Sequence, residues 1–219
     1  MSSGCVMDDV RTKVQSVFRV PAFPDGMFYA FEVALRFELG GEIFALTKRP
    51  ARRFLQAVTR AVAIADAVFL ASENISLLVS HYDWQKPTAA KFRGINASGL
   101  SRRDFALWAS VPQLDADDFA QSDEQVFRHH FVYKGDARAV MRDVMWLALA
   151  KEMPISPDAR WLSMYFVDFD RGICLHPYDD RGMDLVATDK APLIPIYAAF
   201  ENWLLPYDKD RMDAVFGAG

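Results

Sequence analysis

Alternating apolar and polar positions predict several β-strands along the chain. The clearest run spans 29–39, where Phe31, Val33, Leu35 and Phe37 alternate with polar or small residues, as in a strand with one buried face. The same criteria predict further strands at 42–46, 75–82, 125–134, 161–168, 173–177 and 183–188. Short turns connect the last three strands, so we expect them to form an antiparallel three-stranded meander near the C-terminus.

A second pattern, with apolar residues three or four positions apart, predicts helices between these strands. The longest stretch runs from Pro50, which suits a first helical turn, through Phe69, and we expect this helix to end at Asn74. Further helices are expected after the N-capping residues Asp136, Asp189 and Asp208, and short helices at 8–17 and 101–108. This mixed order favours an α+β fold, with a largely antiparallel sheet and helices packed mainly on one face.

Length and composition indicate one globular domain. The chain has 219 residues, of which 52% are hydrophobic and 25% charged, and no linker is long enough to separate two domains. We expect an N-terminal tail with a short helix at 1–27, followed by a single α+β domain at 28–216. The net charge of −4 argues against a dedicated nucleic-acid-binding protein, which would normally present a basic face.

The sequence also indicates a cellular compartment. No basic segment followed by an apolar one marks a signal peptide, and no apolar run reaches the roughly 18 residues of a membrane span. Cys5 and Cys174 do not form a disulfide framework, and reduced thiols fit a reducing compartment. We therefore expect a cytoplasmic protein that does not contact a membrane.

The main candidate site is an acidic turn between the last two predicted strands. Its residues are Tyr178, Asp179, Asp180, Arg181, Gly182 and Asp184. The three carboxylates are of the type that binds a hard cation, and Asp179 with Asp180 would also suit an acid/base pair. Neighbouring strand residues point to opposite faces, however, which favours a structural turn. In that interpretation Gly182 supplies a positive φ and Arg181 pairs with a nearby acid.

Other candidate residues lie far from this turn in the sequence. Arg36 and Glu38 share one face of the first strand, and we expect Arg36 to meet the late acids across the sheet as a structural ion pair. The histidines lack the spacing of a zinc site, so no metal or cofactor is expected. One stretch mixes aromatic and basic residues like a nucleic-acid platform, but a solvated loop with a few anchors is favoured. It contains Trp84, Lys86, Lys91, Phe92, Arg93, Arg102, Arg103, Phe105 and Trp108.

Four sequence blocks carry a resemblance to a known family. They are 35–40 (LRFELG), 131–134 (FVYK), 178–185 (YDDRGMDL) and 203–208 (WLLPYD), with Phe216 after them. In this order they resemble the bacterial family called domain of unknown function 3885, over about residues 28–216. The chain departs from the family pattern at Pro206, where relatives are expected to carry Asp. The resemblance adds Trp203 and Asp208 to the candidate residues, and it implies an association with toxin–immunity loci rather than an activity.

Two functional hypotheses follow. The first is a non-enzymatic protein-binding module, specifically an immunity protein that neutralises a basic toxin domain through acidic residues at 115–124 and 178–184. The alternative is a hydrolase or phosphoryl-acting enzyme built on Asp179, Asp180 and Asp184 with Arg36. The sequence does not indicate an oligomeric state.

Overall fold

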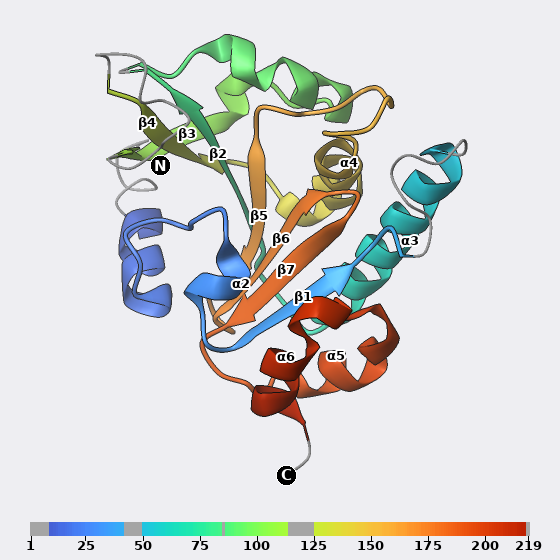
Figure 1. Cartoon of the computed structure of the whole chain (residues 1–219). Coiled ribbons are helices and arrows are strands. Elements are labelled where there is room, and N and C mark those ends of the chain that lie inside the picture. Colours follow the sequence, from blue (N-terminus) through green and yellow to red (C-terminus); the bar gives the residue numbers. More distant parts are fainter. Residues whose placement is uncertain (1–8, 42–49, 85, 114–124, 218–219) are drawn as a thin grey trace.

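A seven-stranded antiparallel sheet forms the centre of the molecule, with strand order β1-β7-β6-β5-β2-β4-β3 (Figure 1). The computed structural model describes residues 9–41, 50–84, 86–113 and 125–217. The strands are β1 (Ala34–Glu38), β2 (Ser76–Asp83), β3 (Phe105–Pro112), β4 (Phe127–Tyr133), β5 (Ser163–Asp168), β6 (Ile173–Asp179) and β7 (Gly182–Ala187). The predicted α+β class is confirmed, and so is the meander, because β5, β6 and β7 pair in sequence.

The first strand joins the sheet beside the last one. β1 pairs with β7 in a register that places Arg36 opposite Asp184. The other edge of β1 is covered by a segment from near the C-terminus, since the Leu205 N–H donates to the Arg36 carbonyl oxygen at 2.8 Å. A sheet edge that would otherwise expose unpaired backbone groups is thereby closed.

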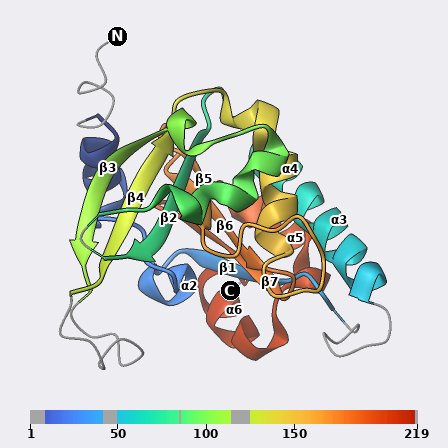
Figure 2. The ribbon, with the colours of Figure 1, turned by 90° about the horizontal axis from the view of Figure 1, so that it is seen from above.

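Helices α3 (Pro50–Val68) and α4 (Ala137–Leu149) lie together on one side of the sheet (Figure 2). They pack through an edge-to-face contact between Phe54 and Trp146, whose ring centroids are 4.5 Å apart. The predicted cap of α4 is confirmed, because the Asp136 carboxylate accepts the Arg138 N–H at 2.9 Å. Shorter helices are α2 (Met27–Ala30), α5 (Ile194–Ala199) and α6 (Lys209–Phe216), and within the described residues no helix is long and apolar enough to cross a bilayer.

The opposite face of the sheet carries several polar side chains among apolar ones. Strand register places a row of hydrogen-bonding and titratable side chains on it, namely Ser80, His130, Ser163, His176, Asp184 and Arg36. The N-terminal segment covers this face, and Phe23 stacks on Tyr165 with ring centroids 5.6 Å apart. Residues 9–18 are helical, close to the predicted 8–17, and Val14 and Phe18 are buried in the common core. Much of the segment expected as a tail is therefore part of the packed structure.

Several local predictions are wrong. The helix expected after the cap Asp189 begins only at Ile194, with Leu193 as its N-cap, and the helix expected to end at Asn74 ends at Val68. Residues 27–30 form α2, so the strand predicted at 29–39 begins only at Ala34. The helix predicted at 101–108 is a short 3₁₀ turn, η3 (Arg102–Asp104), followed by β3. Pairing with β4 buries Phe105 and Trp108, and this tertiary contact overrides the local helical pattern. The strand predicted at 42–46 and the acidic segment 115–124 lie outside the described residues.

Candidate functional site

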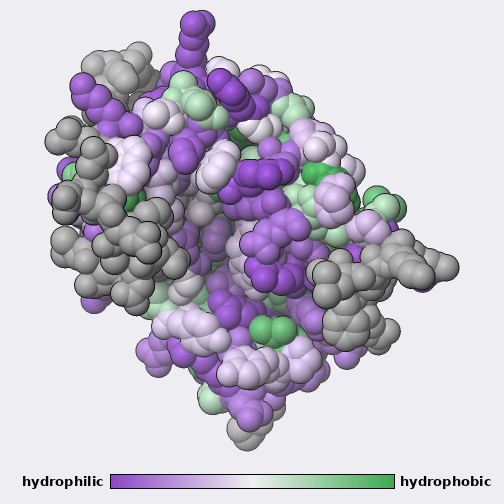
Figure 3. All heavy atoms as spheres, turned by 45° about the horizontal axis from the view of Figure 1, so that its top comes forward, coloured by the Kyte–Doolittle hydropathy of each residue, from purple (hydrophilic) through white to green (hydrophobic). Residues whose placement is uncertain are grey.

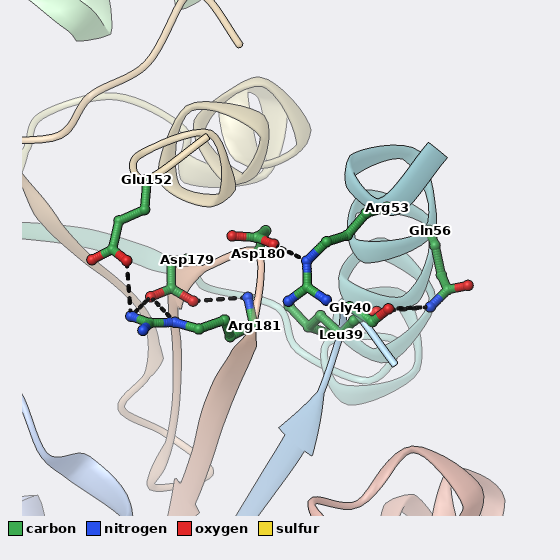
Figure 4. Close-up of polar contacts among 8 residues, drawn as sticks. All are labelled: Leu39, Gly40, Arg53, Gln56, Glu152, Asp179, Asp180 and Arg181. Atoms are coloured by element: carbon green, nitrogen blue, oxygen red, sulfur yellow. Dashed lines mark hydrogen bonds and ion pairs between the residues drawn. The ribbon is translucent and has the colours of Figure 1, made fainter. Parts of the chain in front are cut away.

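The two adjacent acids of the 178–184 turn bind different arginines (Figure 4). Asp180 is buried and accepts a hydrogen bond from Nε of Arg53 on α3. Asp179 accepts from the Arg181 backbone N–H at 2.8 Å and from its Nε at 2.9 Å, and the Arg181 guanidinium also reaches Glu152 at 3.1 Å. The predicted pairing of Arg181 with a local acid is confirmed. The two carboxylates do not converge on one point.

Gly182 has a different role from the one predicted. Its φ is not positive, because among the described glycines only Gly41, Gly99 and Gly172 have that conformation. Instead, a Cβ at this position would lie 2.2 Å from the Tyr178 hydroxyl oxygen and 2.5 Å from a backbone oxygen of β1. The turn therefore needs glycine because β1 and a tyrosine ring approach its backbone closely.

The third acid, Asp184, binds Arg36. The guanidinium donates through Nε at 2.7 Å and through Nη2 at 2.9 Å, and the carboxylate also accepts the Phe28 N–H at 3.0 Å. Arg36 lies 3.5 Å from Asp208, which accepts the Tyr29 hydroxyl at 3.0 Å. The expected ion pair across the sheet is confirmed, and it links β1, β7, α2 and the C-terminal segment. Asp208 contributes to this network and makes no side-chain cap of α6.

The remaining predicted residues fall into two groups. Tyr178 lies beside the network around Arg36: its ring centroid is 5.9 Å from the Arg36 guanidinium carbon. Burial raises the pKa of the Tyr178 hydroxyl. Glu38 and Trp203 instead meet Arg60 of α3, which donates to the Glu38 carbonyl oxygen at 2.9 Å and lies 5.3 Å from the Trp203 ring centroid. The predicted set is thus distributed over several contacts that join the sheet to its neighbours.

The electrostatics of this region are locally compensated. Each of the three carboxylates accepts hydrogen bonds from an arginine side chain, and the three arginines come from β1, α3 and the turn itself. Within the part of the chain that the structure describes, no three His, Cys, Asp or Glu side chains are grouped in a way that could hold a metal ion. This arrangement suits a structural clamp that holds the meander to the rest of the fold.

A second polar cluster, which sequence reasoning missed, lies on the sheet face that the N-terminal segment covers. Arg128 binds Asp25 and the Tyr165 hydroxyl, and its Nε donates to Ser80 at 3.1 Å. Burial lowers the pKa of neighbouring His176 to about 3, which keeps its imidazole neutral. These residues are scattered through 25–176, and only strand register brings them together. No spacing rule would have found them.

One hollow among the described residues is a cleft with two tryptophans. It has a volume of about 320 Å³. Its lining comprises Tyr82, Asp83, Trp84, Lys91, Val126, Arg160, Trp161, Leu162 and Ser163. Trp84 and Trp161 remain 45% and 59% exposed, respectively. We refer to these residues as the tryptophan cleft. Trp84 and Lys91 belong to the aromatic and basic stretch noted in the sequence, but Trp161 was expected only to begin a strand.

The other exposed apolar residues lie outside this cleft. The face drawn in Figure 3 is mostly hydrophilic, and its hydrophobic residues appear as small separate patches. Leu70 and Tyr207, exposed by 84% and 87%, do not line the tryptophan cleft. Isolated exposed apolar side chains are common on soluble proteins, whereas two tryptophans sharing one cleft are a more specific feature.

Comparison with known proteins identifies the family. A family model described as a domain of unknown function, DUF3885, matches residues 10–208. The chain therefore belongs to this family, and the match covers the sheet, both long helices and the tryptophan cleft. No curated protein and no solved structure matches the chain. The match identifies a family and not an activity.

Proposed function

We propose that this protein is a non-enzymatic protein-binding module whose partner docks at the tryptophan cleft. The observation that carries the proposal is that Trp84 and Trp161, both substantially exposed, line the same hollow. Tryptophan is enriched among the few residues that supply most of the energy of protein interfaces, especially where it borders a pocket. Burying the two rings would release a large apolar area from water.

The enzymatic alternative receives no comparable support. A hydrolase or phosphoryl-acting enzyme built on Asp179, Asp180 and Asp184 would need these carboxylates to converge on a substrate in a cavity. Each instead accepts hydrogen bonds from a different arginine, and none of the three lines the tryptophan cleft.

The more specific role that we propose is that of an immunity protein, acting in the bacterial cytoplasm against a toxin domain. It rests on the association with toxin–immunity loci that the sequence resemblance implies for small families of this sort. The geometry argues against one part of this hypothesis, the use of the 178–184 turn as an acidic surface for a basic partner. Arg53, Arg181 and Arg36 offset the charge of the 178–184 turn, which leaves the turn little negative charge to offer a basic partner. The other acidic segment, 115–124, lies outside the described residues.

Co-purification from the native host tests the binding function. Tagged wild-type protein would be compared with the double variant Trp84→Ala and Trp161→Ala, and with Leu70→Ala as a control for the loss of an exposed apolar side chain. We expect wild type and the control to retain one stoichiometric protein and the double variant to lose it while keeping the wild-type circular dichroism spectrum. Absence of any partner with the wild type would contradict the proposal.

A second experiment tests the immunity role. The captured partner would be expressed in a heterologous bacterium, alone and together with wild type or the double variant. We expect the partner alone to arrest growth, wild type to restore it, and the double variant to fail. A partner that does not affect growth would refute the immunity role and leave the binding function intact.

A further inference from the structure

The tryptophan cleft continues into a second hollow. The neighbouring depression has a volume of about 420 Å³ and shares Lys91, Arg160 and Trp161 with the cleft. Its other lining residues include Arg93 and Gly94 of the 3₁₀ helix η2 (Ala89–Ser98). The two hollows together form a groove with the Trp161 ring at their junction. Such a groove has room for an extended peptide segment rather than a single side chain.

The carboxylates of this groove already have partners. Asp83 accepts the Trp84 N–H at 2.9 Å and the Thr88 N–H at 2.8 Å, one on each oxygen. Asp158 accepts two hydrogen bonds from the Arg160 guanidinium, at 2.8 and 2.7 Å. Both acids therefore hold the walls of the groove in place.

Two cations of the groove, Lys91 and Arg93, are not paired with any carboxylate that the structure describes, as Arg160 is. The Lys91 ammonium lies 4.2 Å from the Trp161 ring centroid, a cation–π contact that leaves it open to an anion. Arg93 is exposed. Within the described part of the chain, no carboxylate forms an ion pair with Lys91 or Arg93. The groove therefore carries local positive charge, although the whole chain has a net charge of −4.

The walls of the groove are fixed before any partner binds. At Gly94, a Cβ would lie only 2.0 Å from the Asp158 carbonyl oxygen, so η2 is packed directly against the segment that carries Trp161. On the opposite wall, Nε2 of His129 lies 2.8 Å from the Trp84 carbonyl oxygen. A preformed site loses less entropy on binding than a mobile one.

From this geometry we infer that the groove binds an acidic peptide segment of the partner, with one aromatic side chain seated between Trp84 and Trp161 and carboxylates placed beside Lys91 and Arg93. The inference rests on the proposed binding function and specifies the partner's chemistry at that site. Aromatic rings gain from stacking on tryptophan beyond simple burial, and opposite charge at the rim accelerates association and selects the partner.

Short labelled peptides test this inference by fluorescence anisotropy. The probe is fluorescein-labelled Glu-Asp-Phe-Glu-Asp. The comparison peptides are Lys-Lys-Phe-Lys-Lys and Glu-Asp-Ser-Glu-Asp, and a labelled oligothymidylate represents a single-stranded nucleic acid. We expect the acidic aromatic peptide to bind at least about tenfold more tightly than the other three, a difference of about 1.4 kcal/mol. Its affinity should fall as salt is added, because exposed charges are screened.

Variants locate the binding. Trp161→Ala should abolish peptide binding, and the charge reversal Lys91→Glu with Arg93→Glu should shift the preference to the basic peptide. Arg142→Glu changes an exposed cation that does not line the groove and should have little effect. No binding of the acidic peptide at about 1 mM, stronger binding of the oligothymidylate, or unchanged binding by Trp161→Ala would each overturn the inference.

The peptide result can be separated from the test of the proposed function. A host partner that is lost with the tryptophan variants, combined with a preference for the basic peptide, would leave the binding function standing and reject the partner chemistry. Selective binding of the acidic peptide without any host partner would support the chemistry inferred for the groove and reject the proposed binding function in the host.

Discussion

The substitution Asp184→Asn tests whether the network around Arg36 holds the fold together. The Asp184 side chain is completely buried, and the Arg36 side chain is 14% exposed. The substitution keeps the size of the side chain but removes its charge and replaces one acceptor oxygen with a donor. Arg36 would lose its bidentate partner, and the Phe28 N–H would lose its acceptor if the new amide group turned towards it.

The expected cost is large relative to the stability of a typical domain. Removing one partner of a buried ion pair destabilises a protein by about 3–5 kcal/mol, because the remaining charge stays buried without compensation. Total stabilities are about 5–15 kcal/mol. In a domain of about this size, each kcal/mol lowers the melting temperature by about 2–4 °C, which gives a decrease of about 6–20 °C.

Urea unfolding followed by circular dichroism measures this cost against a matched control. Asp66→Asn is the same chemical change in the Asp66–Arg142 pair, where the side chains are 56% and 71% exposed. It should cost about 0–1 kcal/mol. Adding Arg36→Met to Asp184→Asn should restore part of the loss, because the uncompensated charge is removed. A cost for Asp184→Asn within about 1 kcal/mol of the control would refute the reasoning.

Three further predictions concern other parts of the structure. Arg53→Met leaves the buried Asp180 carboxylate without this arginine, and urea unfolding should show a cost of about 3 kcal/mol or more, whereas Arg142→Met, in a pair whose side chains are both exposed, should cost under about 1 kcal/mol. Equal costs for the two variants would contradict this. Gly94→Ala should destabilise the protein by about 1–3 kcal/mol and increase acrylamide quenching of tryptophan fluorescence, since its Cβ would lie 2.0 Å from a facing backbone oxygen. A thermally unchanged variant would argue against that close packing. Burial lowers the pKa of His130 and His176 from 6.5 to about 3, so the unfolded chain binds more protons between these values, and stability should fall as pH decreases through this window. The slope is about 1.4 kcal/mol per pH unit for each histidine. Urea unfolding between pH 7 and pH 4 should therefore give a shallower slope for His130→Gln, and an unchanged slope would exclude that histidine as a contributor.

Much of the architecture was predictable because its signals are local. The two-residue period of β5–β7 and their short connections indicated an antiparallel meander. The helical period after Pro50 and the cap at Asp136 indicated the two long helices. These features depend on residues close together in the sequence, and the tertiary structure reinforces their preferences rather than opposing them.

The errors occurred where distant contacts decide the conformation. Residues 105–112 become a strand because β4 offers a hydrogen-bonding edge, which a local pattern does not contain. Gly182 is required by the approach of β1 and of the Tyr178 ring, and not by its own turn geometry. An ion pair between Arg36 and the late acids was anticipated from chemistry, but the choice of Asp184 depends on strand register, and the participation of Asp208 and Tyr29 depends on how the C-terminal segment and α2 pack.

The α+β class, the meander and the blocks that resemble the family are predictable from the chain alone, because periodicity, turn residues and caps are encoded over a few neighbouring positions. The partners of the acids and the meeting point of the exposed aromatic residues depend instead on the packing of distant segments. Asp179, Asp180 and Asp184 are adjacent or nearly so in sequence, yet each accepts hydrogen bonds from a different arginine. Trp84 and Trp161 are far apart in sequence but share one cleft. The physical reason is that side-chain partners depend on register and packing between distant segments, and those are settled only when the whole core forms.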